Sequence, residues 1–221
     1  MINLLQIDST HTAAASGISL FDLLKLGGWV MIPLMLLLVI TIFVFFERLI
    51  AIRKASNIDP NFMNIIRDHI ISGNVTAARS FAKNTNNPVA RIIDKGIQRI
   101  GKPIENIERS MENVGKLEIY NLERNLSILS LSAGISPLLG FLGTIIGMFQ
   151  LFYSLATDGD FTIQTMANGI YTKVITSATG LIIGLLAYVA HNYLPTQVDK
   201  TAYKMEASSA EFLDILQEPT R

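Results

Sequence analysis

An eight-residue segment at the start of a long apolar stretch, in the C-terminal third of the sequence, contains four hydroxyl side chains. They are Thr172, Thr176, Ser177 and Thr179, and a fifth, Thr144, lies in the apolar stretch before it. A hydroxyl donates and accepts hydrogen bonds without carrying charge, so such groups can bind water or a buried carboxylate inside a membrane. The alternative, which composition alone leaves open, is that each hydroxyl bonds to the carbonyl four residues earlier in its own helix.

Glycines accompany these hydroxyls at helical spacing. In the earlier stretch Gly143 and Gly147 form a GxxxG pair, and Gly140 shares a face with Gly147. In the later stretch Gly180 and Gly184 form a second pair. Small residues at this spacing let two helices approach closely within a membrane. Helix packing is therefore the role predicted for these five glycines.

The elements that must position these residues are three charge-free apolar runs. They cover residues 26–46, 125–157 and 174–198, and contain 21, 33 and 25 residues. A bilayer core of roughly 30 Å is crossed by about 20 helical residues, so each run is long enough to span it. Only 16% of all residues are charged, against about 25% in an average soluble domain. The sequence predicts an all-α membrane protein with three transmembrane helices, the third extending over 173–198.

The basic residues predict the orientation of these spans. The segment 47–124 holds 13 of the 18 Lys and Arg residues, whereas the loop 158–172 holds none. The positive-inside rule places 47–124 and the tail 199–221 in the cytoplasm. It places the loop 158–172 and the N-terminal segment 1–25, an amphipathic stretch, on the periplasmic side.

The cytoplasmic segments have the apolar periodicity of helices. Turn residues separate predicted helices over 61–72, 75–84 and 88–101, and a further helix from Ile104 is expected to continue unbroken into the second span. The tail repeats this periodicity. We therefore expect the transmembrane helices to have long cytoplasmic extensions.

Several functional classes find no support in the sequence. The chain has no cysteine and three scattered histidines, so no disulfide or metal site is predicted. Its formal net charge is zero, which argues against a nucleic-acid partner. No nucleophile–base set or phosphate loop indicates an enzyme or a cofactor. The three apolar runs also lack Asp, Glu and Arg, so a proton crossing here would need a titrating carboxylate from another subunit.

Two segments resemble a known family. Residues 139–148, LGFLGTIIGM, are similar to the second-helix signature of the MotA/TolQ/ExbB proton channel family, and residues 169–181, GIYTKVITSATGL, followed by Asn192, are similar to its third-helix signature. The length and the three spans resemble the ExbB and TolQ branches, ExbB most, rather than the four-span MotA branch.

The resemblance implies an inner-membrane homopentamer whose second and third helices line a pore. Inside it would lie helices of an ExbD-like one-span partner that supplies the proton-carrying Asp, with a TonB-like protein passing motion to the outer membrane. By motif, Thr144 matches the pore-facing threonine of the second helix and Ser177 matches the third-helix threonine. We expect both to line the proton pathway together with Thr172, Thr176 and Thr179, although the family's frequent third-helix glutamate falls on Thr172. A TolQ-like envelope-integrity or motility stator, a self-contained channel and a non-conducting membrane scaffold remain alternatives.

Overall fold

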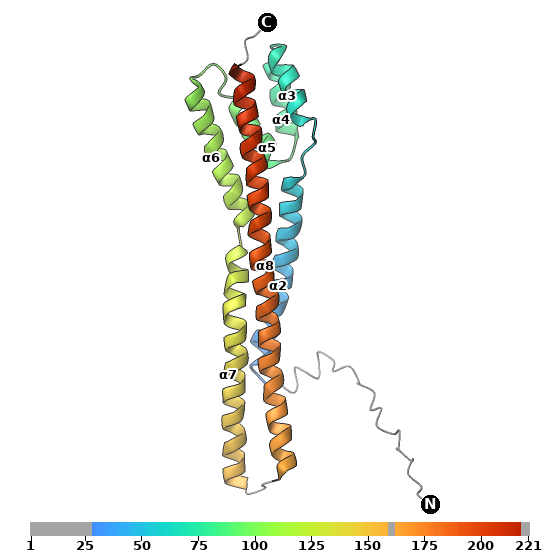
Figure 1. The fold of residues 1–221 in the computed structure, drawn as a ribbon, viewed down its shortest axis with the longest axis vertical. Helices are drawn as coiled ribbons and strands as arrows, with labels where there is room; N and C mark the ends of the chain where they lie inside the picture. The colour runs from blue at the N-terminus through green and yellow to red at the C-terminus, as the bar shows by residue number, and fades with distance from the viewer. Residues whose placement is uncertain (1–27, 159–161, 218–221) are drawn as a thin grey trace, which may run out of the picture. The chain divides into compact units, whose positions relative to one another are not determined.

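The computed structural model describes residues 28–158 and 162–217, and every regular element within them is an α-helix (Figure 1). Three of these helices are long and apolar enough to cross a membrane, which confirms the predicted all-α membrane fold. The N-terminal segment 1–25 and most of the connection between the second and third of these helices lie outside the described residues. The helices are α2 (Met31–Ser56), α3 (Phe62–Ile71), α4 (Val75–Asn84), α5 (Pro88–Ile97), α6 (Ile104–Glu123), α7 (Leu126–Asp158) and α8 (Ile163–Gln217).

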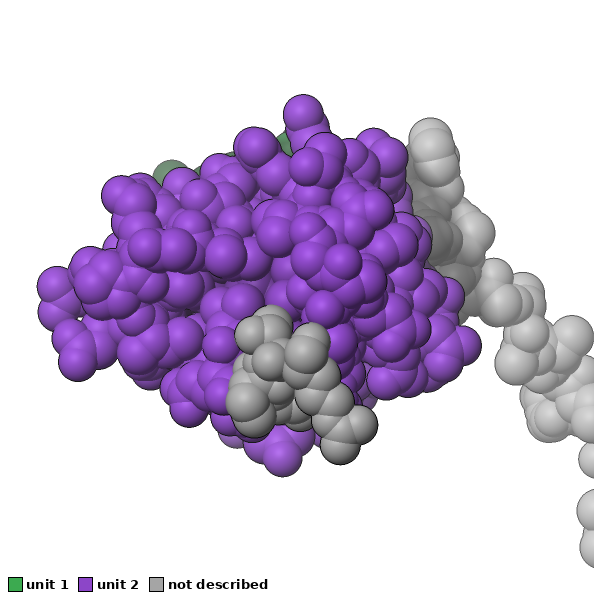
Figure 2. All heavy atoms as spheres, turned by 90° about the horizontal axis from the view of Figure 1, so that it is seen from above, with its two compact units in different colours: residues 1–37, 135–183 green, residues 38–134, 184–221 purple. Residues whose placement is uncertain are grey.

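The chain divides into two compact units, coloured separately in Figure 2. Unit 1 comprises Met1–Leu37 and Ile135–Ile183, and unit 2 comprises Leu38–Gly134 and Gly184–Arg221. The three membrane-crossing helices α2, α7 and α8 contribute residues to both units. Unit 1 therefore contains the hydroxyl and glycine motifs, except Gly184, and unit 2 contains the basic segment.

The short helices of unit 2 begin within one residue of the predicted positions, but α5 ends at Ile97, four residues before the predicted end at Gly101. The side-chain oxygen of Asn74 accepts a hydrogen bond from the Ala77 amide at 3.1 Å, and that of Asn87 accepts one from Val89 at 2.9 Å, so each asparagine caps a helix. Pro88 occupies the first turn of α5, where its missing N–H costs nothing. Helices α3 to α6 and the end of α8 enclose an apolar core that includes Phe62, Ile66, Ile93, Met111 and Phe212.

The expectation of one unbroken helix from Ile104 through the second span is wrong. Helix α6 ends at Glu123, Arg124 is extended, and Asn125 has a φ of 68°. Asparagine is among the few residues that adopt this left-handed conformation readily. The Asn125 carbonyl then accepts a bond from the Ile128 amide at 3.1 Å and opens α7. The break therefore lies at the first residue of the charge-free run.

Helix α8 joins the third span to the C-terminal tail without interruption, as the predicted cytoplasmic extension requires. A second apolar cluster of unit 2 forms where it meets α2 and the start of α7; it includes Val44, Ile52, Leu129, Leu194 and Val198. Arg48 is buried beside this cluster, pairs with Glu47 and donates to the Asn121 carbonyl at 3.1 Å. These contacts of Arg48 attach the C-terminal half of α2 to the end of α6.

Candidate functional site

The candidate site is the surface of unit 1 where residues 136–147 of α7 meet residues 173–180 of α8, named here the α7–α8 seam. Its closest approach lies at Gly140 and Gly180. A Cβ on Gly180 would lie 2.6 Å from the Ser136 carbonyl oxygen and 2.8 Å from the Gly140 Cα. These are backbone atoms, so no side-chain movement could make room. The two helices are in direct backbone contact, which only glycine at both positions permits.

The other motif glycines have different neighbours. A Cβ on Gly143 would lie 2.7 Å from the Thr176 methyl and 3.1 Å from the Cγ1 atom of Val30, so the residue that precedes α2 also approaches here. At Gly147 the neighbour is the aliphatic stem of Lys173, whose Cγ would lie 2.7 Å from an added Cβ. Gly184 is buried, but it belongs to unit 2. Glycines of the same GxxxG spacing therefore make different contacts: Gly180 meets backbone, Gly143 meets short side chains, and Gly147 meets the stem of a lysine.

Thr144 bridges the two helices of the seam. Its hydroxyl lies 3.2 Å from the Gly140 carbonyl of its own helix and 3.2 Å from the Lys173 carbonyl of α8. A threonine hydroxyl has one proton, so these two carbonyls share a single donor. Both lone pairs of the Thr144 oxygen are left to accept.

The four motif hydroxyls of α8 have different surroundings. Thr179 donates to the Ile175 carbonyl at 2.9 Å, the bond within its own helix that the simpler interpretation expected. Thr176 is fully buried, and its hydroxyl has no hydrogen-bond partner among the described residues. Ser177 is half-buried, and its carbonyl faces Gly140. The side chain of Thr172 lies outside the described residues.

The sequence did not predict that Ser136 and Lys173 take part in the seam. Ser136 is fully buried with no partner for its hydroxyl among the described residues, as is Thr176. Lys173 supplies the carbonyl that Thr144 reaches and the stem that fills the space beside Gly147. Ser136 lies four residues before Gly140, so the helical spacing that selected Gly140, Thr144 and Gly147 could also have selected it.

The seam offers neutral hydrogen-bonding groups in an apolar setting and no charge except that of Lys173. Within the described ranges, no group of three or more His, Asp or Glu side chains is placed to hold a metal ion. Buried hydroxyls without partners retain the capacity to bind water or a carboxyl group from another chain, because satisfying such a group is worth about 1–3 kcal/mol. The arrangement suits recognition of an uncharged or titrating polar group.

Comparison with known proteins connects this seam to a family. The model of the MotA/TolQ/ExbB proton channel family matches residues 84–207, a segment that contains the whole seam. A putative biopolymer transport protein ExbB homolog of Methanothermobacter thermautotrophicus is 27% identical over 161 residues, which cover 72% of this chain and 57% of that protein.

Relatives from two branches of the family are similar. The biopolymer transport protein exbB1 of Vibrio cholerae is 35% identical over 88 residues, 39% of each chain. The Tol-Pal system protein TolQ of Haemophilus influenzae is 31% identical over 111 residues, which cover 50% of this chain and 47% of that protein. The chain thus matches about two fifths to three fifths of the length of these relatives.

Proposed function

Because the chain belongs to the MotA/TolQ/ExbB proton channel family, we propose that it is an ExbB-like subunit of a proton-driven motor in the inner membrane. Five copies would surround the transmembrane helices of an ExbD-like, one-span partner. Motion driven by the proton motive force would pass through a TonB-like protein and energise transport at the outer membrane. The 13 basic residues of segment 47–124 support an orientation with this segment in the cytoplasm.

The observation that carries the proposal is a seam rich in hydroxyls within spans that have no carboxylate. The charge-free runs 125–157 and 174–198 contain no group that can release or take up a proton near neutral pH, apart from His191. A proton pathway at membrane depth requires an ionisable side chain. The partner's Asp would supply it, and the seam hydroxyls would set its hydrogen-bonding environment.

The geometry of Thr144 favours one protonation state of that Asp. The hydroxyl proton of Thr144 is directed at the Gly140 and Lys173 carbonyls, so the Thr144 oxygen can accept a further hydrogen bond but cannot donate one. A protonated carboxyl can donate to it, whereas a carboxylate cannot. Thr144 would therefore stabilise the neutral Asp and raise its pKa, which allows the group to cross an apolar region uncharged. The half-buried Ser177 would complete the polar surface.

The test combines Thr144→Val with Ser177→Ala, two changes close in shape to the native residues. Membrane hydroxyl bonds average about 0.6 kcal/mol, so the variant should still fold and bind its partner. Proton uptake by vesicles containing the complex, and the transport it powers, should fall sharply. Thr196→Val, which removes an exposed hydroxyl of α8 bonded to the Asn192 carbonyl, is the matched control and should leave both unchanged. Normal proton uptake in the double variant would refute the role of the hydroxyls.

A TolQ-like role in envelope integrity is the second candidate, and the similarity to TolQ proteins of Haemophilus influenzae and Pseudomonas aeruginosa, 31% and 30% identical, supports it. The two candidates predict different partners and phenotypes. Deletion of an ExbB-like subunit should abolish energised uptake, whereas deletion of a TolQ-like subunit should sensitise cells to detergent. Native mass spectrometry of the complex with its co-purifying one-span protein would test the proposed five copies directly.

A further inference from the structure

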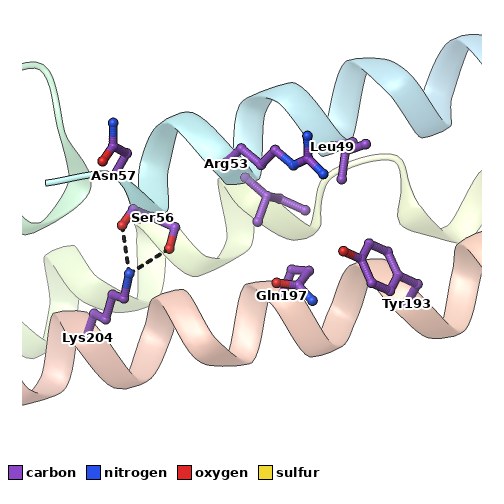
Figure 3. A pocket seen from close by; sticks show the side chains of 8 residues that line it. Leu49, Arg53, Ser56, Asn57, Tyr193, Gln197 and Lys204 are labelled. Carbon is purple, nitrogen blue, oxygen red and sulfur yellow. Dashed lines mark hydrogen bonds between the residues drawn. The ribbon is translucent and has the colours of Figure 1, made fainter.

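A basic pocket of unit 2 lies between the C-terminal end of α2 and the middle of α8, outside the α7–α8 seam. Its volume is ≈ 270 Å³. Two of the eight residues that line it are cations, Arg53 and Lys204, and none is acidic. Figure 3 shows side chains from both helices directed into the space between them. The lining residues are Leu49, Ile52, Arg53, Ser56, Asn57, Tyr193, Gln197 and Lys204.

No carboxylate in the described part of the chain neutralises either cation. Lys204 donates to the carbonyl and the hydroxyl of Ser56 at 2.9 and 3.0 Å, which fixes its ammonium over the C-terminal end of α2 (Figure 3). An ammonium has three N–H donors, so at least one remains available. Among the described residues, neither Lys204 nor Arg53 forms an ion pair with an acidic side chain. The hydrogen bonds to the end of α2 give Lys204 a structural role, but they give none to Arg53.

The pocket lies where the lipid-facing surface ends. On α2 the last exposed large apolar side chain is Ile50, 66% exposed, and on α8 the closely spaced run of such side chains ends at Tyr193, 44% exposed, with the isolated Tyr203 ten residues further on. Arg53 follows Ile50 by three residues, a rise of roughly 4.5 Å along the helix. The polar headgroup layer adds roughly 5–8 Å to each side of the hydrocarbon core. Arg53 therefore reaches the depth of lipid phosphates.

The apolar surface leads into the pocket along both helices. On α2, Phe46 and Ile50 lie on the same face as Arg53 by the i, i+4, i+7 spacing, and both are exposed. On α8, the exposed Val189 lies four residues before Tyr193. An acyl chain could lie on this surface while its headgroup entered the pocket. A free phosphate ion has no apolar group that could contact these side chains.

We propose that this pocket binds the phosphate headgroup of an anionic phospholipid from the leaflet at the inner end of α2. Arg53 contributes charge-assisted hydrogen bonds to the phosphate, and Lys204 contributes its remaining donor. The Tyr193 hydroxyl and the Gln197 amide bind the neutral part of the headgroup. Basic pockets between transmembrane helices at a membrane surface commonly bind such headgroups. The site joins the C-terminal end of α2 to the middle of α8 and is independent of the proposed proton pathway.

The experiment measures lipid binding by the full-length, delipidated chain in detergent, using native mass spectrometry. Dioleoylphosphatidylglycerol should bind in preference to dioleoylphosphatidylcholine. Arg53→Gln should lower this preference about tenfold, the usual effect of one charge-assisted hydrogen bond. This variant keeps the Lys204–Ser56 bonds and so tests the site even if Arg53→Gln with Lys204→Gln fails to fold. Lys54→Gln with Lys200→Gln removes two neighbouring exposed charges from the same helices and should have no effect.

Three results would overturn the proposal. Equal loss of preference in the Lys54 and Lys200 control would mean that overall charge, not the pocket, attracts the lipid. Displacement of the lipid by inorganic phosphate in molar excess would assign the pocket to a free anion. A fall in oligomer mass in Arg53→Gln, with unchanged lipid preference, would assign it to an acidic segment of a neighbouring copy.

Discussion

The backbone contact between Gly140 and Gly180 makes a quantitative prediction for Gly180→Ala. The added Cβ would lie 2.6 Å from the Ser136 carbonyl oxygen, whereas real Cβ atoms essentially never have contacts below 3.0 Å, and their ordinary van der Waals contacts begin at 3.4 Å. Helices α7 and α8 would have to separate locally by about 0.4–0.8 Å. A gap of about 0.5–1 Å already loses a quarter to a half of each dispersion contact. Such packing supplies most of the attraction between helices in a membrane.

The expected cost follows from two opposing contributions. Forcing an extra methyl group into a packed interface costs about 1–3 kcal/mol, and replacing a helical glycine by alanine returns at most about 1 kcal/mol. We expect Gly180→Ala to lose about 1–2 kcal/mol, which for a chain of this length lowers the melting temperature by about 2–8 °C.

Gly134→Ala is the matched control, measured by thermal unfolding in the same detergent. Gly134 is a helical glycine like Gly180, but it lies in α7, and nothing lies within 4 Å of its added Cβ. This variant should melt at or slightly above the wild-type temperature. If Gly180→Ala and Gly134→Ala had the same melting temperature, the two helices would not be in backbone contact at Gly180, and the description of the seam would be wrong.

Three further predictions concern the rest of the chain. A cysteine at Ile163, which is 89% exposed, should react with an impermeant thiol reagent in intact cells, whereas one at the exposed Asn86 should react only after lysis; the reverse pattern would invert the predicted orientation. Asn125→Ala should lose about 1 kcal/mol of unfolding free energy because of its φ of 68°, whereas Asn125→Gly should be nearly neutral, and equal melting temperatures would contradict the left-handed break. Gly96→Ala should lose about 1–2 kcal/mol, because its Cβ would lie 2.6 Å from core side chains of α6 and α8, whereas Gly115→Ala, with 3.7 Å of clearance, should not; denaturant titration of both variants would show the difference.

The sequence predicted the helices of unit 2 well because their boundaries depend on local chemistry. Asn74 and Asn87 cap the helices that follow them, and both caps are visible as short polar interruptions between apolar runs. The same local logic failed at Asn125. There, no glycine or proline marked the break, and an asparagine beside an arginine looked compatible with a continuing helix. A single asparagine is a weak indication of a left-handed residue, and the strong apolar periodicity on both sides outweighed it.

The seam could be predicted only in part, because spacing fixes which residues share a helical face but not what lies opposite them. Gly147 and Gly180 both belong to GxxxG pairs, yet one meets the flexible stem of Lys173 and the other a rigid backbone. Thr144 and Thr179 are equally polar, yet one bridges two helices and the other bonds within its own. The distinction depends on the rotation of α7 and α8 about their axes, which three-dimensional packing sets. That rotation directs the Thr144 proton to the Lys173 carbonyl, and so decides whether this hydroxyl can stabilise a neutral or a charged carboxyl beside it.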